Sequence, residues 1–247
     1  MIQTRWDYSK PSVKDKQQWN ELVLEWLALS PRDRHPYHLK STEHSLLPLT
    51  SEQIGRVLAP FQTVHERNAA LSAGHYRMSP IWLRTCYAAE LADFYRPPNE
   101  SDNIVGSREI LDDEAIYSEL AGDWRRIFFR VPSIADVVQI YGDPDLEDVE
   151  MLDSDWGEPE EEYQRPVHEA QKQEKGLIYL LDEEALREKV VKVMWLGKCG
   201  NCVWDFKVRD LWEFQGPLKR GLSILEIIER YDYTSHPAKW ERGALLD

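Results

Sequence analysis

With 247 residues, 11% of them aromatic and 30% charged, the chain is long enough to bury a core as one large domain or two small ones. The net charge of −14 argues against direct binding to nucleic-acid backbones, which requires clustered Lys and Arg. No run of about eighteen apolar residues predicts a membrane-spanning helix, and the first residues lack the apolar stretch of a secretory signal. Three cysteines, an odd number, favour the reducing cytoplasm over a secreted disulfide framework.

The first part of the chain, residues 1–141, is predicted to be a helical domain. Apolar residues at helical spacing predict one amphipathic helix over 14–30 and another over 50–73, which Pro60 should kink or split. Ser79 and Pro80 resemble the cap and first turn of a third helix that ends at Pro97. A fourth helix is expected over 112–131, and a short one follows near 133–141.

The last part, residues 175–247, is predicted to be a small α+β domain. Apolar residues indicate a short strand over 177–181, and Asp182 is placed to cap a short helix. Residues 191–196 and 202–208 alternate with period two around the turn sequence GKCGN, which predicts a β-hairpin. A closing helix is expected over 218–231. The fold class is therefore α+β and predominantly helical, with a helical N-terminal part and a small α+β part that contains a β-hairpin.

Between these parts lies the acidic segment, residues 142–174. Residues 142–164 contain eleven carboxylates and no Lys or Arg, so they account for most of the net charge. Acidic residues interleaved with large apolar ones can offer apolar anchors to a basic, grooved partner. A solvated linker is the alternative. The candidate partner-binding residues are Asp143, Asp145, Glu147, Asp148, Glu150, Asp153, Asp155, Trp156, Glu158, Glu160, Glu161 and Glu162.

Histidines are the candidate catalytic residues. His35, His38 and His44 lie within ten residues of one another, and His75 follows later in the first part. Imidazole is a common general acid or base and a common metal ligand. These four residues could therefore serve an enzyme with an aromatic-lined pocket that acts on a small molecule. The polar, proline-containing context of the first three is equally typical of a surface loop.

Cys199 and Cys202 form the motif CGNC at the expected hairpin tip. A tight turn can aim both sulfurs at one zinc ion, but a structural zinc site needs four ligands. No second pair of this spacing occurs in the chain, so two ordinary structural thiols are the alternative reading. Zinc is the only cofactor that the sequence suggests, and it would make the chain a zinc-stabilised interaction module.

The charge pattern favours a non-catalytic cytoplasmic binding protein of the inhibitor, immunity or scaffold type. Its acidic segment would bind a basic protein surface, with Trp156 as an apolar anchor. Neither nucleic acid nor a membrane is expected as a partner. The small-molecule enzyme and the zinc-stabilised module remain as the two alternative hypotheses.

Overall fold

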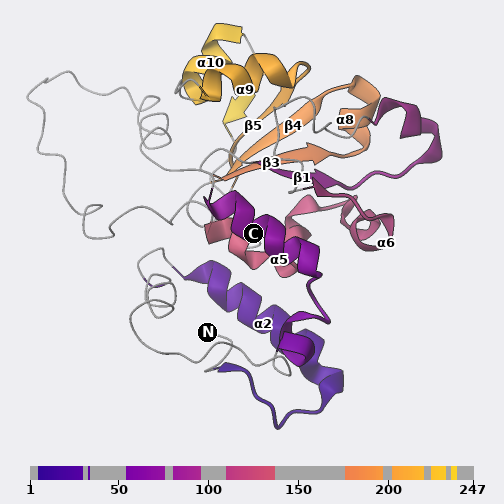
Figure 1. Ribbon diagram of the computed structural model, residues 1–247, viewed down its shortest axis with the longest axis vertical. Helices are drawn as coiled ribbons and strands as arrows, with labels where there is room; N and C mark the ends of the chain where they lie inside the picture. The colour runs from indigo at the N-terminus through magenta and orange to yellow at the C-terminus, as the bar shows by residue number, and fades with distance from the viewer. Residues whose placement is uncertain are drawn as a thin grey trace, which may run out of the picture.

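The computed structural model describes residues 5–29, 33, 54–75, 80–95, 110–136, 176–196, 202–219, 224–231 and 235–237. In these residues six strands form one mixed sheet in the order β2-β1-β3-β4-β5-β6 (Figure 1). The strand β1, second from one edge, is parallel to both of its neighbours, and the strands from β3 to β6 pair antiparallel. The strands are β1 (Ile81–Arg84), β2 (Ile110–Leu111), β3 (Gly176–Leu181), β4 (Val191–Leu196), β5 (Cys202–Val208) and β6 (Ser235–Pro237).

The sheet is the middle of three layers. Side chains alternate between the two faces of a strand, so Trp82 and Tyr179 join one buried cluster while Leu83 and Leu180 join the other. The helices α9 (Leu211–Lys219) and α10 (Ile224–Tyr231) cover the Trp82 face. The helices α2 (Asp15–Ala28) and α5 (Val64–His75) lie on the Leu83 side, as Figure 1 shows.

Several predicted elements are confirmed. The helix expected over 14–30 is α2, whose predicted apolar stripe is buried at Trp19 and Val23. The three strands predicted in the last part are β3, β4 and β5, and the last two pair as the expected antiparallel hairpin. The helix α8 (Glu183–Glu188) begins where expected, because the Asp182 side chain accepts a hydrogen bond from the backbone N–H of Ala185 at 2.8 Å. The chain is therefore an α+β protein, predominantly helical in its N-terminal part.

The helix predicted after Pro80 is wrong, because residues 81–84 form the strand β1 between β2 and β3. Only a short 3₁₀ helix, η3 (Ala89–Phe94), follows it. A parallel strand buried on both faces is a continuous apolar run rather than an alternating one. The run Ile81, Trp82, Leu83 has this character, and the Ser79-Pro80 pair before it only resembled a helix start.

The single helix predicted over 112–131 is also wrong. Residues 110–111 form β2, and Asp113 and Asp123 each begin a new short helix by accepting a backbone N–H, from Ala115 at 3.0 Å and from Arg125 at 3.2 Å. Asp side chains favour such caps over helix interiors, so they interrupt the apolar periodicity. The short elements are α6 (Glu114–Tyr117), η5 (Ser118–Leu120), η6 (Trp124–Phe129) and η7 (Pro132–Asp136).

Two further helices differ in extent from their predictions. Pro60 does split the second helix, into the π-type turn η2 (Ile54–Leu58) and α5. The reciprocal cap of α5 is made by Thr63 and Glu66. Near the end of the chain, one helix was expected over 218–231. The structure has two helices there, α9, which begins earlier at Leu211, and α10.

Strands from both predicted domains share the sheet. Residues 81–84 of the first part pair in register with residues 178–181 of the last part, and β1 lies between β2 and β3. The division at residues 142–174 remains a prediction about folding units. No helix among the described residues is both long and apolar enough to cross a bilayer.

Candidate functional site

Most residues predicted to carry function lie outside the described part of the chain. This holds for the whole acidic segment, including Asp143–Glu162 with Trp156, and for His35, His38, His44 and Cys199. His75 ends α5 and Cys202 begins β5, but their side chains are not described. The partner-binding, catalytic and zinc assignments therefore stay predictions. Among the described residues, no group of three or more His, Cys, Asp or Glu side chains is arranged to hold a metal ion.

The described residues place two grooves at one edge of the sheet. The carboxyl ends of β1, β3 and β5 meet at this edge, because β1 and β3 are parallel and β5 runs antiparallel to β4. In open sheets that contain parallel strands, ligands usually bind beyond the carboxyl ends of those strands. The helix α8 starts there, and both grooves are lined partly by it and partly by Val190, Arg209 and Asp210.

The charged groove encloses about 820 Å³. Lys192 of β4 and Lys207 of β5 lie directly opposite each other in its wall, a pairing that like charges disfavour. Glu184 of α8 ion-pairs with both ammonium groups, and it lies 2.6 Å from Lys207. Asp182 adds a contact of 2.6 Å to Lys192, and Glu188 one of 2.9 Å to Lys207. The carboxylates of α8 therefore bind this helix to the sheet.

These contacts shift the titration of the cluster. Hydrogen bonds from Lys192 and then Lys207 lower the pKa of Glu184 to about 2, because they favour its charged form. Burial lowers the pKa of Lys192, but its hydrogen bonds to Asp182 and Glu184 outweigh this effect and hold it above the usual value. The hydrogen bonds of Lys207 to Glu184 and Glu188 raise its pKa as well. Glu184, Lys192 and Lys207 are thus each held in the charged form.

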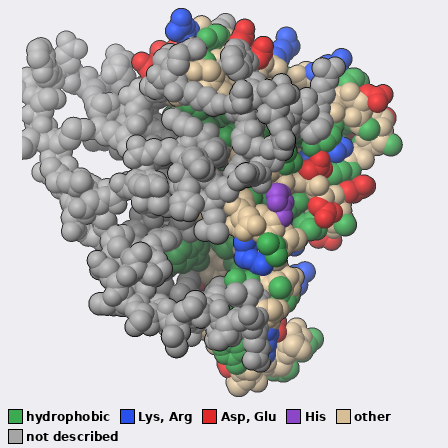
Figure 2. Space-filling view, viewed as in Figure 1, with side chains coloured by type: hydrophobic (Ala, Val, Ile, Leu, Met, Phe, Trp, Pro, Cys, Tyr) green, Lys and Arg blue, Asp and Glu red, His purple; other side chains and the backbone are tan. Residues whose placement is uncertain are grey.

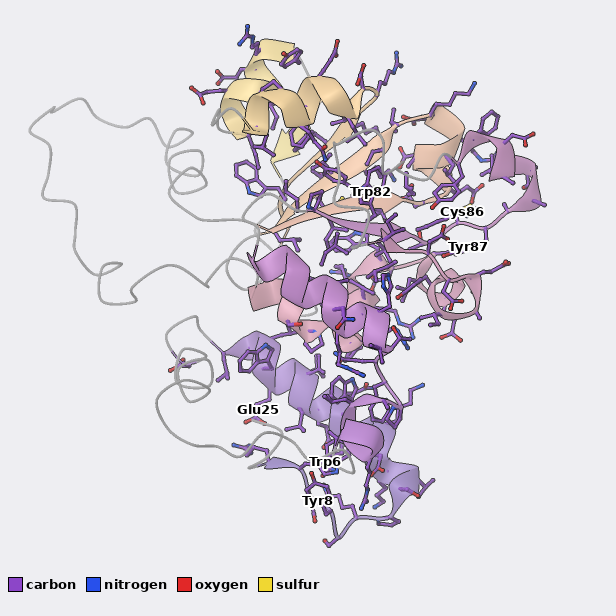
Figure 3. The ribbon with its side chains drawn as sticks, viewed as in Figure 1. Trp6, Tyr8, Glu25, Trp82, Cys86 and Tyr87 are labelled. Carbon is purple, nitrogen blue, oxygen red and sulfur yellow. The ribbon has the colours of Figure 1, made fainter. Side chains whose placement is uncertain are left out.

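The aromatic groove lies on the other side of α8 and encloses about 640 Å³. Trp82 of β1 contributes to its lining, and its indole Nε1 is buried without a hydrogen-bond partner among the described residues. Figure 3 shows Trp82 on the sheet, with Cys86 and Tyr87 just beyond the end of β1. The groove is lined by Trp82, Asp93, Phe94, Tyr95, Leu181, Ala185, Leu186, Lys189, Val190, Val191, Arg209, Asp210 and Leu211.

The rim of the aromatic groove carries a backbone conformation that is unusual for its residue. Lys189, directly after α8, has φ of 56° and is the only residue other than glycine with positive φ in the described chain. It ends the helix in the left-handed conformation for which glycine is normally used. Its ammonium lies 4.9 Å from the centre of the Phe94 ring, a cation–π contact that connects α8 to η3.

An arginine held between two tyrosines fixes one wall of the aromatic groove. The guanidinium of Arg84 lies 4.5 Å from the ring centre of Tyr87 and 4.0 Å from that of Tyr95, and 3.5 Å from the Asp112 carboxylate. Burial, followed by a hydrogen bond to Asp112, raises the pKa of Tyr95. Arg84 thus joins the ends of β1 and β2 and holds Tyr95 in place at the groove.

A second cluster of titratable groups is buried below the sheet. Glu66 of α5 is fully buried and accepts hydrogen bonds from Arg130 at 2.5 and 3.0 Å, from the Tyr117 hydroxyl at 3.0 Å and from the Thr63 backbone at 2.6 Å. Burial and the Glu66 charge raise the pKa of Tyr117. Both oxygens of the carboxylate have partners, so this cluster stabilises the fold and offers no free acid or base.

The sequence contained signals for parts of this site that periodicity did not reveal. The dipeptide Arg209-Asp210 directly follows a correctly predicted strand, and the pattern Thr63-Val64-His65-Glu66 is a capping box. Nothing in the sequence indicated that β1 would lie beside β3, so the groove between them and α8 could not be foreseen. Comparison with protein-family models, with curated proteins and with solved structures found no match for this chain.

Proposed function

We propose that this chain is a non-catalytic cytoplasmic binding protein whose acidic segment docks onto a basic protein surface. The observation that carries this proposal is the distribution of charge. The eleven carboxylates of residues 142–164 have no Lys or Arg among them. Their charge is therefore balanced only by cations from elsewhere in the chain or from another molecule.

The described part of the chain supports an external partner. Many of its cations already have a carboxylate partner within this part, so the acidic segment would have to compete for them. This holds for Arg5, Arg56, Arg84, Arg125, Arg130, Arg187, Lys192 and Lys207. Figure 2 shows acidic and basic side chains interspersed over the coloured surface.

A negative segment of this kind acts mainly on association. Its field steers a basic partner toward the protein and raises the association rate, and salt screens this effect over about 10 Å at 0.1 M. The large side chain of Trp156 would then supply an apolar anchor within the docked segment. We therefore expect binding that weakens strongly with salt and that depends on both the carboxylates and this tryptophan.

A matched pair of variants tests the proposal. The first changes Glu158, Glu160, Glu161 and Glu162 to Gln. The control changes four exposed glutamates of the described part to Gln, namely Glu21, Glu114, Glu119 and Glu229. Both variants lose the same charge, so only the position of the lost charge differs between them.

Each protein is used to capture partners at 50 mM and 300 mM salt, and a captured partner is then titrated by calorimetry. We expect a basic partner that the first variant binds about tenfold more weakly than the control does. High salt should reduce the affinity of the unchanged protein in the same way. Equal binding by the two variants, or capture that is independent of salt, would contradict the proposal.

A further inference from the structure

The aromatic groove differs from the charged groove in how its charges are used. Asp93, Lys189 and Arg209 line it, yet none of the three makes an ion pair with another described residue. In the charged groove, by contrast, Lys192 and Lys207 are fully engaged with the carboxylates of α8. The aromatic groove thus presents two cations and a carboxylate that are not ion-paired with other described residues, although Arg209 also lines the charged groove.

A lining residue of the groove carries a buried hydrogen-bond donor. Trp82 is only 4% exposed, and its Nε1 has no acceptor among the described residues. A buried N–H group without an acceptor is costly, and native proteins rarely leave one unpaired. The remaining lining is mostly apolar and includes Leu181, Val191 and Leu211, and the volume falls in the range of small-molecule sites.

We propose that the aromatic groove binds a small zwitterion with an apolar body, the chemical class of apolar amino acids and dipeptides. The carboxylate of the ligand pairs with Lys189 and Arg209, and its ammonium pairs with Asp93. Its apolar body lies on the floor between β3 and α9. A carbonyl or carboxylate oxygen accepts the hydrogen bond of Trp82. The charged side chains at the rim favour a ligand that carries both a positive and a negative charge. The apolar floor favours a ligand whose body is apolar.

Three probes test the charge requirement on the full chain by calorimetry. L-phenylalanine has both charged groups, 3-phenylpropionate lacks the ammonium, and 2-phenylethylamine lacks the carboxylate. We expect saturable binding of L-phenylalanine and at least about fivefold weaker binding of each analogue. The absence of L-phenylalanine binding at millimolar concentration would overturn the proposal. A smaller loss for either analogue would overturn it as well.

Matched variants assign the binding to this groove. Trp82→Phe removes the indole N–H and should weaken L-phenylalanine binding about fivefold, whereas Trp195→Phe removes an indole of the same buried layer that does not line the groove. Lys189→Gln and Arg209→Gln should each weaken binding about fivefold, and Arg187→Gln, on α8 but away from the groove, should not. A thermal melt of each variant confirms folding.

The exposed rim variants keep the test decisive if Trp82→Phe does not fold. Unchanged affinity in both Lys189→Gln and Arg209→Gln would overturn the proposal. Equal losses in these variants and in Arg187→Gln would do so too. The acidic segment takes no part in this experiment, so its outcome is independent of the proposed docking to a basic protein.

Discussion

At the scale of single residues, Glu66 is the most deeply buried charged residue of the described part of the chain. Its carboxylate is fully buried, and Arg130 binds both of its oxygens. Breaking a buried ion pair by removing one charge is costly, because the other charge stays behind without its partner. The side chain of Arg130 is 27% exposed, so water relieves part of this cost.

We therefore predict that Glu66→Gln lowers the free energy of unfolding by about 2–4 kcal/mol. Glutamine keeps the shape of the side chain, so the loss reports the charge rather than a cavity. Urea denaturation of both proteins at neutral pH measures it. Glu183→Gln on the surface of α8 is the control, because it breaks an exposed pair with Arg187 and should change nothing measurable. Equal losses of unfolding free energy in the two variants would show that the buried charge of Glu66 stabilises the fold no more than an exposed one.

Lys189 is strained by its positive φ of 56°. A left-handed conformation costs a residue with a Cβ about 1–2 kcal/mol, and glycine avoids this cost but loses more entropy on folding. We predict that Lys189→Gly is more stable than Lys189→Ala by about 1 kcal/mol. Both changes remove the ammonium from the Phe94 ring, so their difference isolates the backbone. Chemical denaturation measures the difference in free energy of unfolding between the two variants. An alanine variant as stable as the glycine variant would show that the backbone of Lys189 is not strained.

At the scale of elements, the sequence predicted the helices and strands that depend on local patterns. It missed those that depend on pairing between strands distant in the sequence. The helix α2 and the hairpin of β4 and β5 were predictable, because their apolar periods match the face that they bury. The strand β1 was mistaken for a helix, because a strand buried on both faces lacks that period. The aromatic groove depends on β1 and β3 being neighbours, because Trp82 and Leu181 both line it, and these strands are far apart in the sequence. The aromatic groove was therefore not predictable from local patterns.

The attachment of α8 to the sheet should depend on pH. The pKa of Glu184 is about 2 in the folded protein, against an ordinary value of 4.5. A lowered folded pKa means that the contribution of this group is complete above pH 4.5 and is lost as the pH falls from 4.5 toward 2. The side chain is half exposed, so the effect is modest and should shrink with added salt.

We predict that Glu184→Gln is less stable than the unchanged protein at pH 6, and that this difference narrows steadily below pH 4.5. Urea denaturation at pH 6, 5, 4 and 3 in 50 mM salt measures the difference at each step. Lys192 and Lys207 lose their shared partner in this variant, which is the reason for the loss at pH 6. A difference that stays constant down to pH 3 would show that the carboxylate of Glu184 is not held in its charged form.

At the scale of the whole molecule, the sheet links the two parts that the acidic segment separates in sequence. The strand β3 has β1 on one side and β4 on the other, and its Ile178 and Leu180 belong to the same buried cluster as Ile81 and Leu83. Residues 175–247 alone would leave that face of β3 without its covering layer. Burial of this apolar surface is a main source of stability in such a core, so we expect each part to need the other in order to fold.

We predict that the two halves, residues 1–153 and 154–247, fold together when they are co-expressed as separate chains. A tag on one half should then recover both in equal amounts, because β1 and β3 still pair and close the core. Each half expressed alone should show no cooperative thermal transition. The matched control carries Leu83→Asp, which places a charge at a fully buried position of β1 and should abolish the co-purification. Independent cooperative folding of residues 154–247 would instead show two separate domains, and the acidic segment would then be a linker between them.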